Sequence, residues 1–226
     1  MKRLLNTLYI TTPESYLSKD GLNVVISVKQ KEIFRIPILN IEGIVTFGYM
    51  GASPGLMKLC ADNGVSLTFL SPNGRYIARA QGSIKGNVLL RKRQYQLSDD
   101  KIFSLHISKL FVAGKIQNYR NILRRFIRDH GNNINVEKAA RSLENSKKDA
   151  LKALDGNQLR GIEGNAANSY FDIFQDLIIN QNEEFIFHGR SRRPPKDEIN
   201  AMLSFVYTLI ANDVSAALET VGLDPY

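Results

Sequence analysis

The sequence predicts an α+β protein in which a β-strand domain with one short helix is followed by an all-helical domain. Short runs rich in Ile, Val, Phe and Thr fill roughly the first 80 residues. After residue 97 the apolar residues recur at the three- and four-residue spacing of helices. Strands followed by helices, without alternation, favour two segregated units. We therefore place the strand domain at residues 1–88, a linker at 89–97 and the helical domain at 98–226.

The strand domain is expected to consist of short strands joined by tight turns. Asp20-Gly21 and Asn73-Gly74 are dipeptides typical of hairpins. Between them, Ser53 is suited to cap a short helix and Asn63-Gly64 to end it. The strands are expected at residues 4–12, 23–28, 32–38, 41–47, 65–70 and 75–80.

The helical domain is expected to hold four helices. Ser98-Asp99-Asp100 places acidic residues where a helix start favours them, and Gly131 ends that first helix. A second helix fits residues 136–154, and a third begins near Glu163. A charged loop at residues 180–196 then leads to a fourth helix at residues 197–220.

Charge is distributed unevenly along the chain. The net charge is +8, and residues 1–98 hold 13 Lys and Arg against 5 Asp and Glu, a balance of +8. A basic surface attracts polyanions such as nucleic acids, although many basic proteins bind none. Charge alone leaves both interpretations open.

Several classes of protein are disfavoured. Cys60 is the only cysteine, which excludes an internal disulfide and a cysteine metal cluster. The longest apolar stretch, residues 202–211, is interrupted by Ser204 and Thr208 and falls short of the ~20 residues that span a bilayer. No export signal is recognisable, so we expect a cytoplasmic protein without a membrane segment.

Glu163 is the first candidate for chemistry. It lies between Gly161 and Gly164, and the helix expected after it carries mainly small side chains. A carboxylate beside a small-residue surface suits a divalent ion that bridges protein and phosphate. The alternative is an acid at a helix N-terminus that the helix dipole favours, and spacing alone favours this alternative.

Polar and basic residues supply candidates for nucleic-acid contact. Asn200, Ser204 and Tyr207 fall on one face of the last expected helix, where their partners are either another helix or a ligand such as a DNA backbone. Lys115 lies beside Gly114 inside a helix. The other basic candidates are Arg75 and Arg79 on the last expected strand, Lys85 in the segment before the expected linker, and Arg190, Arg192 and Arg193 in the long loop. Singly each is weak, but together they favour a nucleic-acid groove.

Two long segments carry a resemblance to a known family. RGIEGNAANSYF at residues 160–171 and RPPKDEINAMLSFVY at residues 193–207 are similar to signatures of the universal integrase of CRISPR adaptation. GLDPY at residues 222–226 resembles the start of a third block. LLNTLY at residues 4–9 and ARAQG at residues 78–82 are similar to the type I branch, subtype C.

The resemblance implies a metal-dependent DNA endonuclease and integrase that inserts new spacers by transesterification. It implies a homodimer that works with a small ferredoxin-like partner protein on spacer-precursor and leader–repeat DNA. An iron–sulfur exonuclease of the same system is a further candidate partner. Mg²⁺ or Mn²⁺ would be the cofactor, with Glu163 as a metal ligand. Asn200 and Tyr207 would lie close to the active site, and Arg75 would contact DNA.

One departure from the family pattern concerns the metal site. The family's other two ligands, a histidine and an aspartate, follow the block that begins GLDP, whereas the printed chain ends at Tyr226. From the resemblance we expect a chain that lacks its C-terminal end and whose activity is impaired. The alternative is a basic DNA-binding or architectural dimer without catalytic activity.

Overall fold

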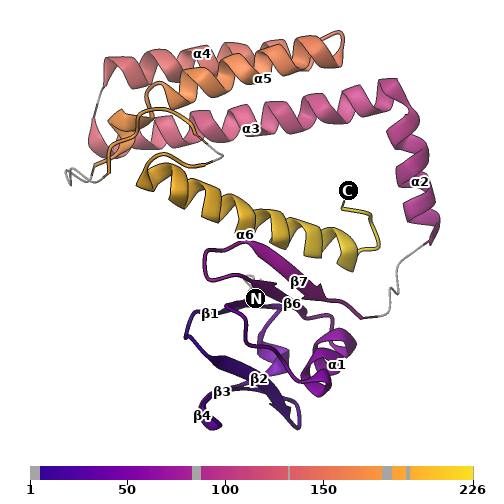
Figure 1. Ribbon diagram of the computed structural model, residues 1–226. Coiled ribbons are helices and arrows are strands. Elements are labelled where there is room, and N and C mark those ends of the chain that lie inside the picture. The colour runs from indigo at the N-terminus through magenta and orange to yellow at the C-terminus, as the bar shows by residue number, and fades with distance from the viewer. Residues whose placement is uncertain (1–5, 83–87, 132, 180–184, 192–193, 226) are drawn as a thin grey trace. The chain divides into compact units, whose positions relative to one another are not determined.

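The computed structural model describes residues 1–226 except 1–5, 83–87, 132, 180–184, 192–193 and 226 (Figure 1). Its N-terminal sheets and largely helical remainder confirm the α+β class. The chain forms two compact parts. The strand part comprises Met1–Lys92 and Phe205–Tyr226, and the helical part comprises Arg93–Ser204. This division departs from the predicted boundaries because the last helix begins in the helical part and continues in the strand part.

The first sheet of the strand part has four described strands in the order β1-β5-β6-β7. The strands are β1 (Thr7–Ile10), β5 (Gly43–Phe47), β6 (Ser66–Leu70) and β7 (Tyr76–Ala80). β5 is parallel to both β1 and β6, and β7 closes the sheet as an antiparallel neighbour of β6. The parallel pair β5–β6 is joined through helix α1 (Pro54–Asp62), as a parallel connection requires.

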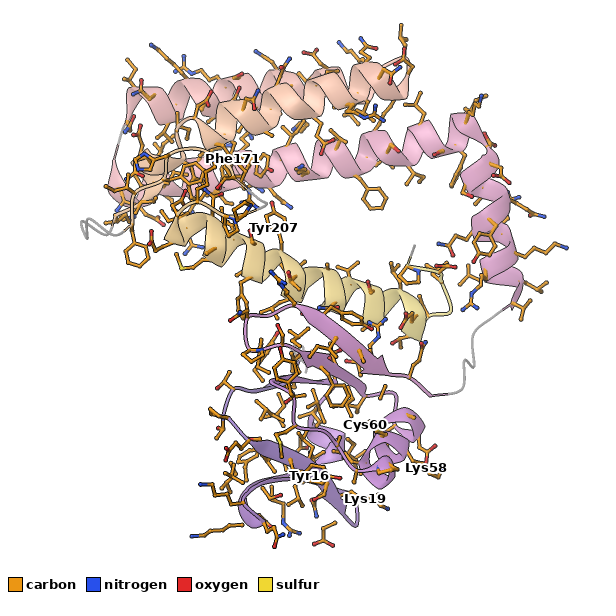
Figure 2. The ribbon with its side chains drawn as sticks, viewed as in Figure 1. Tyr16, Lys19, Lys58, Cys60, Phe171 and Tyr207 are labelled. Carbon is orange, nitrogen blue, oxygen red and sulfur yellow. The ribbon has the colours of Figure 1, made fainter. Side chains whose placement is uncertain are left out.

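Helix α1 confirms the sequence prediction in detail. The Ser53 hydroxyl accepts the Leu56 N–H at 3.2 Å, and Pro54 occupies the first turn. Leu56 and Cys60 point into the core of the strand part, where Cys60 is labelled in Figure 2. Burial raises the pKa of the Cys60 thiol to about 11, because the apolar surroundings disfavour the thiolate.

The second sheet is an antiparallel meander of β2 (Ser15–Asp20), β3 (Asn23–Val28) and β4 (Lys31–Pro37). Strand β2 is not among the predicted strands, because its mixture of Ser, Lys and Asp lacks a strand-like composition. A short 3₁₀ helix, η1 (Ile38–Asn40), follows β4.

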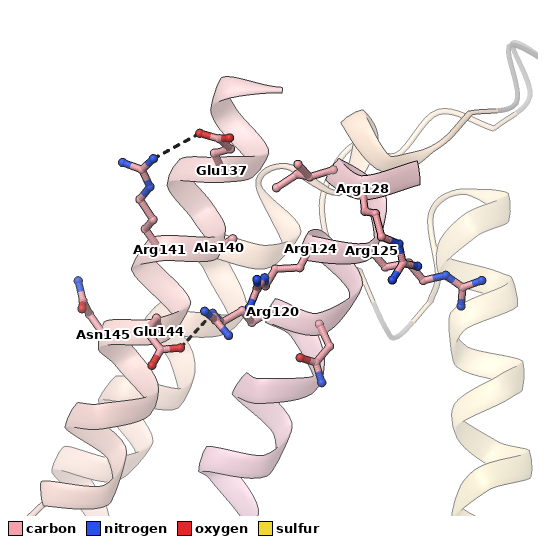
Figure 3. A pocket seen from close by; sticks show the side chains of 11 residues that line it. Arg120, Arg124, Arg125, Arg128, Glu137, Ala140, Arg141, Glu144 and Asn145 are labelled. Carbon is pink, nitrogen blue, oxygen red and sulfur yellow. Dashed lines mark hydrogen bonds and ion pairs between the residues drawn. The ribbon is translucent and has the colours of Figure 1, made fainter. Parts of the chain in front are cut away.

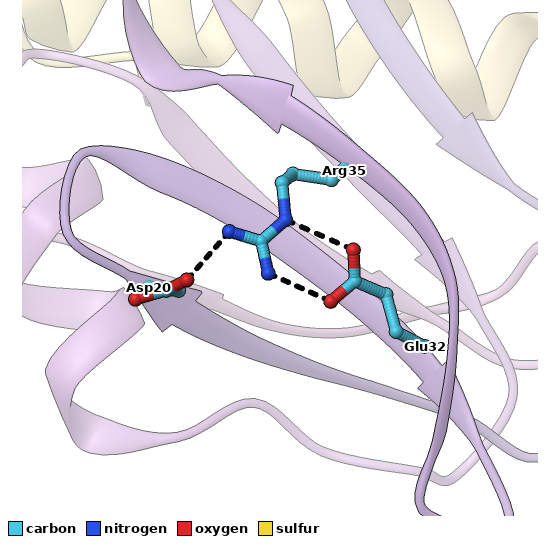
Figure 4. A network of polar contacts seen from close by, with 3 residues as sticks. All are labelled: Asp20, Glu32 and Arg35. Atoms are coloured by element: carbon cyan, nitrogen blue, oxygen red, sulfur yellow. Dashed lines mark hydrogen bonds and ion pairs between the residues drawn. The ribbon is translucent and has the colours of Figure 1, made fainter.

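An ion-pair cluster ties the strands of this sheet together (Figure 4). The Arg35 guanidinium donates to Asp20 on β2 at 2.5 Å and to Glu32 on its own strand at 2.7 Å. The hydrogen bonds from Arg35 lower the pKa of Glu32. Since all three side chains are exposed, the cluster adds little to stability.

The helical part is built on three long helices. They are α3 (Lys101–His130), α4 (Ile134–Lys152) and α5 (Gly156–Phe171), followed by the 3₁₀ helix η2 (Phe174–Leu177). Asp100 caps α3 by accepting the N–H groups of Ile102 and Phe103, and Gly131 ends it, as predicted. The helices pack around a common core that includes Ile116, Leu123, Val136, Leu143 and Leu159.

The segment predicted as a linker is helical. Helix α2 (Val88–Asp99) covers residues 89–97 although it buries none of its side chains. Leu, Arg, Lys and Gln are strong helix formers, so local propensity favours a helix here.

Helix α6 (Glu198–Thr220) is the most apolar helix of the described chain. It alone among the described helices is long and apolar enough to cross a membrane by length and composition. The expectation that no stretch reaches this length is therefore corrected. α6 nevertheless carries Asn212 and Asp213, and Phe205 stacks on Phe47 of the strand part at 5.7 Å. The two polar residues and the ring contact are typical of a helix that packs on protein.

Candidate functional site

Glu163 lies in the middle of α5 and not at its start. Asp155 caps the helix by accepting the N–H groups of Asn157 and Gln158, so α5 begins at Gly156. The prediction of a helix beginning near Glu163 is wrong, because Gly161 and Gly164 are accommodated inside the helix. The dipole explanation for Glu163 is therefore excluded, since that effect fades beyond the first turn.

The Glu163 carboxylate is paired with Lys115 of α3. Lys115 Nζ lies 2.7 Å from Glu163 Oε1, across a sequence separation of 48 residues. The two side chains are 41% and 36% exposed, so solvent screens the pair and its contribution to stability is small, about 0–1 kcal/mol. Lys115 Nζ also lies 5.9 Å from the centre of the Tyr119 ring.

An aromatic cluster lies next to the Lys115–Glu163 pair. Tyr119 of α3 stacks on Tyr170 of α5 with ring centres 4.2 Å apart and nearly parallel planes. Phe171, labelled in Figure 2, packs against Tyr170 and against Phe187. Because Tyr170 is buried, it cannot stack on a nucleic-acid base, and its role is to fix α5 on α3.

The surface beside the pair is open. A Cβ added at Gly161 or Gly164 would meet no described atom within 4 Å, and the same holds for Gly114 beside Lys115. Glycine costs a helix interior about 1 kcal/mol relative to Ala, and packing does not require these three. The open surface leaves room for a ligand backbone next to Glu163.

The described residues do not complete a metal site. Nowhere in the described ranges do three His, Cys, Asp or Glu side chains come together as a group able to hold a metal ion. Glu163 instead faces the Lys115 ammonium, which repels a cation. One carboxylate paired with a lysine does not fit a divalent ion, which prefers several oxygen ligands.

Asn200 organises the loop that precedes α6. Its side-chain oxygen accepts from Arg190 Nη1 at 2.6 Å and from the Ser191 N–H at 3.0 Å. Its amide nitrogen donates to the Gly189 carbonyl and to Asp197 Oδ2. The side chain is fully buried and its hydrogen-bonding capacity is used within the chain. These partners lie in the segment before α6 and not on another helix, which was one of the two alternatives that the sequence left open.

Comparison with known families shows which protein family the chain belongs to. The model of the family described as "CRISPR associated protein Cas1" matches residues 8–226. The chain belongs to the Cas1 family. It is 46% identical over 228 residues to "CRISPR-associated endonuclease Cas1 1" of Chlorobaculum tepidum, covering 100% of this chain and 66% of that protein. It is 42% identical over 232 residues to "CRISPR-associated endonuclease Cas1 2" of Rhodospirillum rubrum, covering 100% and 67%.

The chain thus spans about two-thirds of the length of these Cas1 relatives. A third relative, a "Cas4/endonuclease Cas1 fusion" of Geobacter sulfurreducens, is 32% identical over 223 residues, or 97% of this chain and 40% of the fusion.

Solved structures share the fold. A CAS1 protein from Thermotoga maritima superposes with a TM-score of 0.79 over 98% of this chain and 67% of its own, at 22% identity. A "Cas6-RT-Cas1--Cas2 complex" gives a TM-score of 0.75 over 99% and 24%, at 21% identity. A "Casposase bound to integration product" gives 0.75 over 97% and 63%, at 20% identity. At these identities the likeness concerns the Cas1 fold alone.

The DNA-contact candidates differ in how accessible they are within this Cas1 fold. The Arg79 guanidinium is used in contacts within the strand part. It donates to Glu219 at 2.5 Å and to the Asn212 carbonyl at 3.3 Å, both on α6. Arg75 lies in the exposed turn before β7, where its backbone N–H and carbonyl are hydrogen-bonded to Ser71. Tyr207, labelled in Figure 2, is about half-exposed on α6.

The remaining candidates are held locally or are not described. The Ser204 hydroxyl donates to the Asn200 carbonyl at 2.7 Å, one turn earlier on α6. Lys85, Arg192 and Arg193 lie outside the described residues. One residue that was not among the candidates is Asp197, whose carboxylate accepts from the Asn200 backbone and side chain. Its position just before the last helix is the N-cap signal that could have found it.

Proposed function

We propose that the chain carries the DNA-joining chemistry of CRISPR spacer acquisition, as an endonuclease and integrase. The match of the family model across residues 8–226 is the single observation that carries this proposal. Support comes from Glu163, which lies in the signature segment and presents a half-exposed carboxylate on an open helical surface.

The proposed reaction is a transesterification. The 3′-hydroxyl oxygen of the spacer forms a new bond to a phosphorus atom of the repeat, and the bond from that phosphorus to the repeat's own 3′-oxygen breaks. The attacking hydroxyl loses a proton and the departing oxygen gains one, so the number of phosphodiester bonds is unchanged. In this chain Lys115 would place a positive charge beside the phosphate and hold the Glu163 carboxylate where it can accept the proton of the attacking 3′-hydroxyl.

Dependence on Mg²⁺ or Mn²⁺ stays a prediction of the resemblance. The described residues offer one carboxylate held by a lysine, so no step of the reaction is assigned to a metal. Among the DNA contacts we retain Arg75 and Tyr207, which are accessible, while Lys85, Arg192 and Arg193 stay predictions. We propose Arg79, Asn200 and Ser204 as positioning residues, because their polar groups hold other parts of the chain.

We further propose a cytoplasmic homodimer of the type I, subtype C branch that assembles with a Cas2-type protein. A solved complex that shares the fold contains Cas1 and Cas2, and this supports the small partner predicted from sequence. Relatives in which Cas4 and Cas1 are fused support the exonuclease as a second partner.

A strand-transfer assay tests the proposed chemistry. The purified chain is mixed with Mn²⁺, a labelled spacer duplex and a plasmid that carries a leader and repeat. We expect joined product, and we expect Glu163→Gln to lower its rate at least about 10²-fold, the scale of losing one transition-state contact. Asp149→Asn, which removes an exposed carboxylate from α4, is the matched control and should join normally. Undiminished joining by Glu163→Gln would refute the role of Glu163.

The same assay separates the second candidate function, a DNA-binding dimer without turnover. This candidate is favoured by the lack of a three-ligand metal group in the described residues. It predicts salt-sensitive DNA binding and no joined product under any condition. A spacer with 3′-deoxy ends controls for the reaction itself, because product that still forms with such ends cannot arise from attack by the 3′-hydroxyl.

A further inference from the structure

A basic groove runs between the C-terminal half of α3 and the N-terminal half of α4 (Figure 3). Its volume is about 1090 Å³, and neither Glu163 nor Lys115 is among the residues that line it. The α3 wall carries four arginines, Arg120, Arg124, Arg125 and Arg128. The groove is therefore a feature separate from the site at Glu163.

Positive charge predominates in the groove. Arg141 of α4 adds a fifth arginine, and the lining acids are Glu137 and Glu144, so five positive and two negative charges leave +3. Arg120 pairs with Glu144 at 3.0 Å, and Arg141 pairs with Glu137 at 3.4 Å. Both pairs are marked by dashed lines in Figure 3.

The arginines differ in how firmly they are held. Arg125 and Arg128 share Asp129, which lies just outside the lining, at 3.4 and 2.9 Å. The side chains of Arg125, Arg128 and Arg141 are 73–81% exposed, so their ion pairs are weak and a ligand can replace them. Arg124 has no acidic partner in the part of the chain that the structure describes. At least four guanidinium groups are thus available to an anion.

The spacing of these groups suits a linear polyanion. Arg120, Arg124 and Arg128 recur every four residues, so they follow one ridge of α3. Successive members rise by about 6 Å, and the ridge extends over about 12 Å. One strand of DNA presents a phosphate about every 3.4 Å along its axis, so a ridge of this length follows three to four phosphates.

The lining also indicates which polyanion fits. Protein–protein interfaces depend on aromatic anchors in desolvated pockets, and no aromatic side chain is among the described residues of the lining. The apolar members among these described residues are Ile127 and Ala140, whereas Asn121 and Asn145 add neutral hydrogen-bonding groups. The planar guanidinium groups match the geometry of phosphate oxygens. Nucleic-acid bases would need aromatic side chains to stack on, so the described lining suits the backbone and not the bases.

We propose that this groove binds the sugar–phosphate backbone of DNA without reading its sequence. The proposal goes beyond the joining chemistry, because it needs neither Glu163 nor a reactive DNA end. It gives the helical part a contact surface for DNA although the net charge of residues 99–226 is zero.

The test is the salt dependence of DNA affinity. Fluorescence anisotropy of a labelled duplex of arbitrary sequence, about 20 base pairs long, gives the slope of log K against log salt. Arg124→Gln/Arg128→Gln removes two charges and keeps good helix formers. We expect the magnitude of the slope to fall by about 1.8, which corresponds to about 60-fold weaker binding at 0.1 M salt relative to 1 M. A scrambled duplex should give the same result.

Two further variants make the outcome specific. Lys138→Gln/Lys148→Gln removes two exposed charges from α4 outside the groove and should change the slope by much less. Arg124→Lys/Arg128→Lys keeps the charge but loses the guanidinium fork, so it should preserve the slope and bind more weakly. Thermal unfolding of each variant verifies that it folds.

Three results would overturn the proposal. The first is a slope that is the same in the wild type and the groove variant. The second is an equal change in the lysine control. The third is a competition result in which polyglutamate displaces DNA from the wild type and binds the groove variant more weakly than the wild type. This result would assign the groove to an acidic protein. If the wild type binds DNA through the groove but joins none, the joining function fails and the groove proposal stands.

Discussion

Arg79 should act as a structural residue whose loss detaches α6 from the first sheet. Its guanidinium lies on β7, and its partner Glu219 lies in the last turn of α6. The two side chains are only 9% and 18% exposed, and their charged atoms are 2.5 Å apart. Arg79→Met keeps the apolar stem, removes the charge and leaves the Glu219 carboxylate in a nearly dry position.

The expected loss of folding free energy in Arg79→Met follows from the burial of the two side chains. Removing one partner of a buried pair costs about 3–5 kcal/mol, because the remaining charge keeps its desolvation penalty without compensation. Since Glu219 retains some contact with water, we expect the lower end, about 3 kcal/mol. Arg79→Met/Glu219→Leu removes both charges and should recover most of this loss, because an apolar pair of similar size is often neutral.

Urea unfolding followed by circular dichroism measures the four members of this cycle. Lys58 and Asp62 of α1 form the matched control, an ion pair of similar length between largely exposed side chains. Lys58→Met should cost less than about 0.5 kcal/mol. The reasoning is refuted if Arg79→Met costs no more than this control, or if the two single effects simply add in the double variant.

Three other predictions concern separate features. Asn200→Ala should lower the free energy of unfolding by about 2–4 kcal/mol, because it leaves the buried partners of Asn200 without a hydrogen bond. The control, exposed Asn145→Ala, should cost less than about 0.5 kcal/mol. An equally small effect at Asn200 would contradict its assigned role. The Cys60 thiol, with its pKa raised to about 11, should react slowly with a thiol probe at pH 8 and about tenfold faster per pH unit until pH 11. Because the folded pKa is raised, the stability gained by keeping this thiol neutral is lost as pH rises from 9 through 11. Calorimetry should find weak Mn²⁺ binding, since Glu163 is held by Lys115; tight one-site binding by this chain would disprove that assignment.

Local signals predicted the boundaries that local contacts determine. The caps Ser53 and Asp100 satisfy backbone donors within three residues, so their sequence context was sufficient. The start of α5 was misplaced because Gly161 and Gly164 resemble helix boundaries. There the cap Asp155 and the buried Leu159 outweigh the cost of two glycines, and this balance depends on packing against α3 and α4.

Partners distant in sequence explain why the candidate contacts separate into two groups. Helical periodicity placed Asn200 on a polar face but could not show that a loop about ten residues earlier uses its amide. Likewise, nothing near Arg79 in sequence indicates Glu219, which lies 140 residues away. Side chains that the fold uses for itself look the same in sequence as those it leaves for a ligand, and only burial distinguishes them.

Net charge conceals the groove for a related reason. The helical segment balances 17 basic against 17 acidic residues, so composition assigns it no affinity for DNA. A helix sorts charges by period, however, and the four-residue spacing of Arg120, Arg124 and Arg128 collects them on one ridge. The acids of α4 neutralise only part of this ridge, because Glu144 and Glu137 pair with Arg120 and Arg141. The electrostatic surface that DNA meets is therefore determined by how α3 and α4 are aligned, and a neutral segment can present a strongly positive groove.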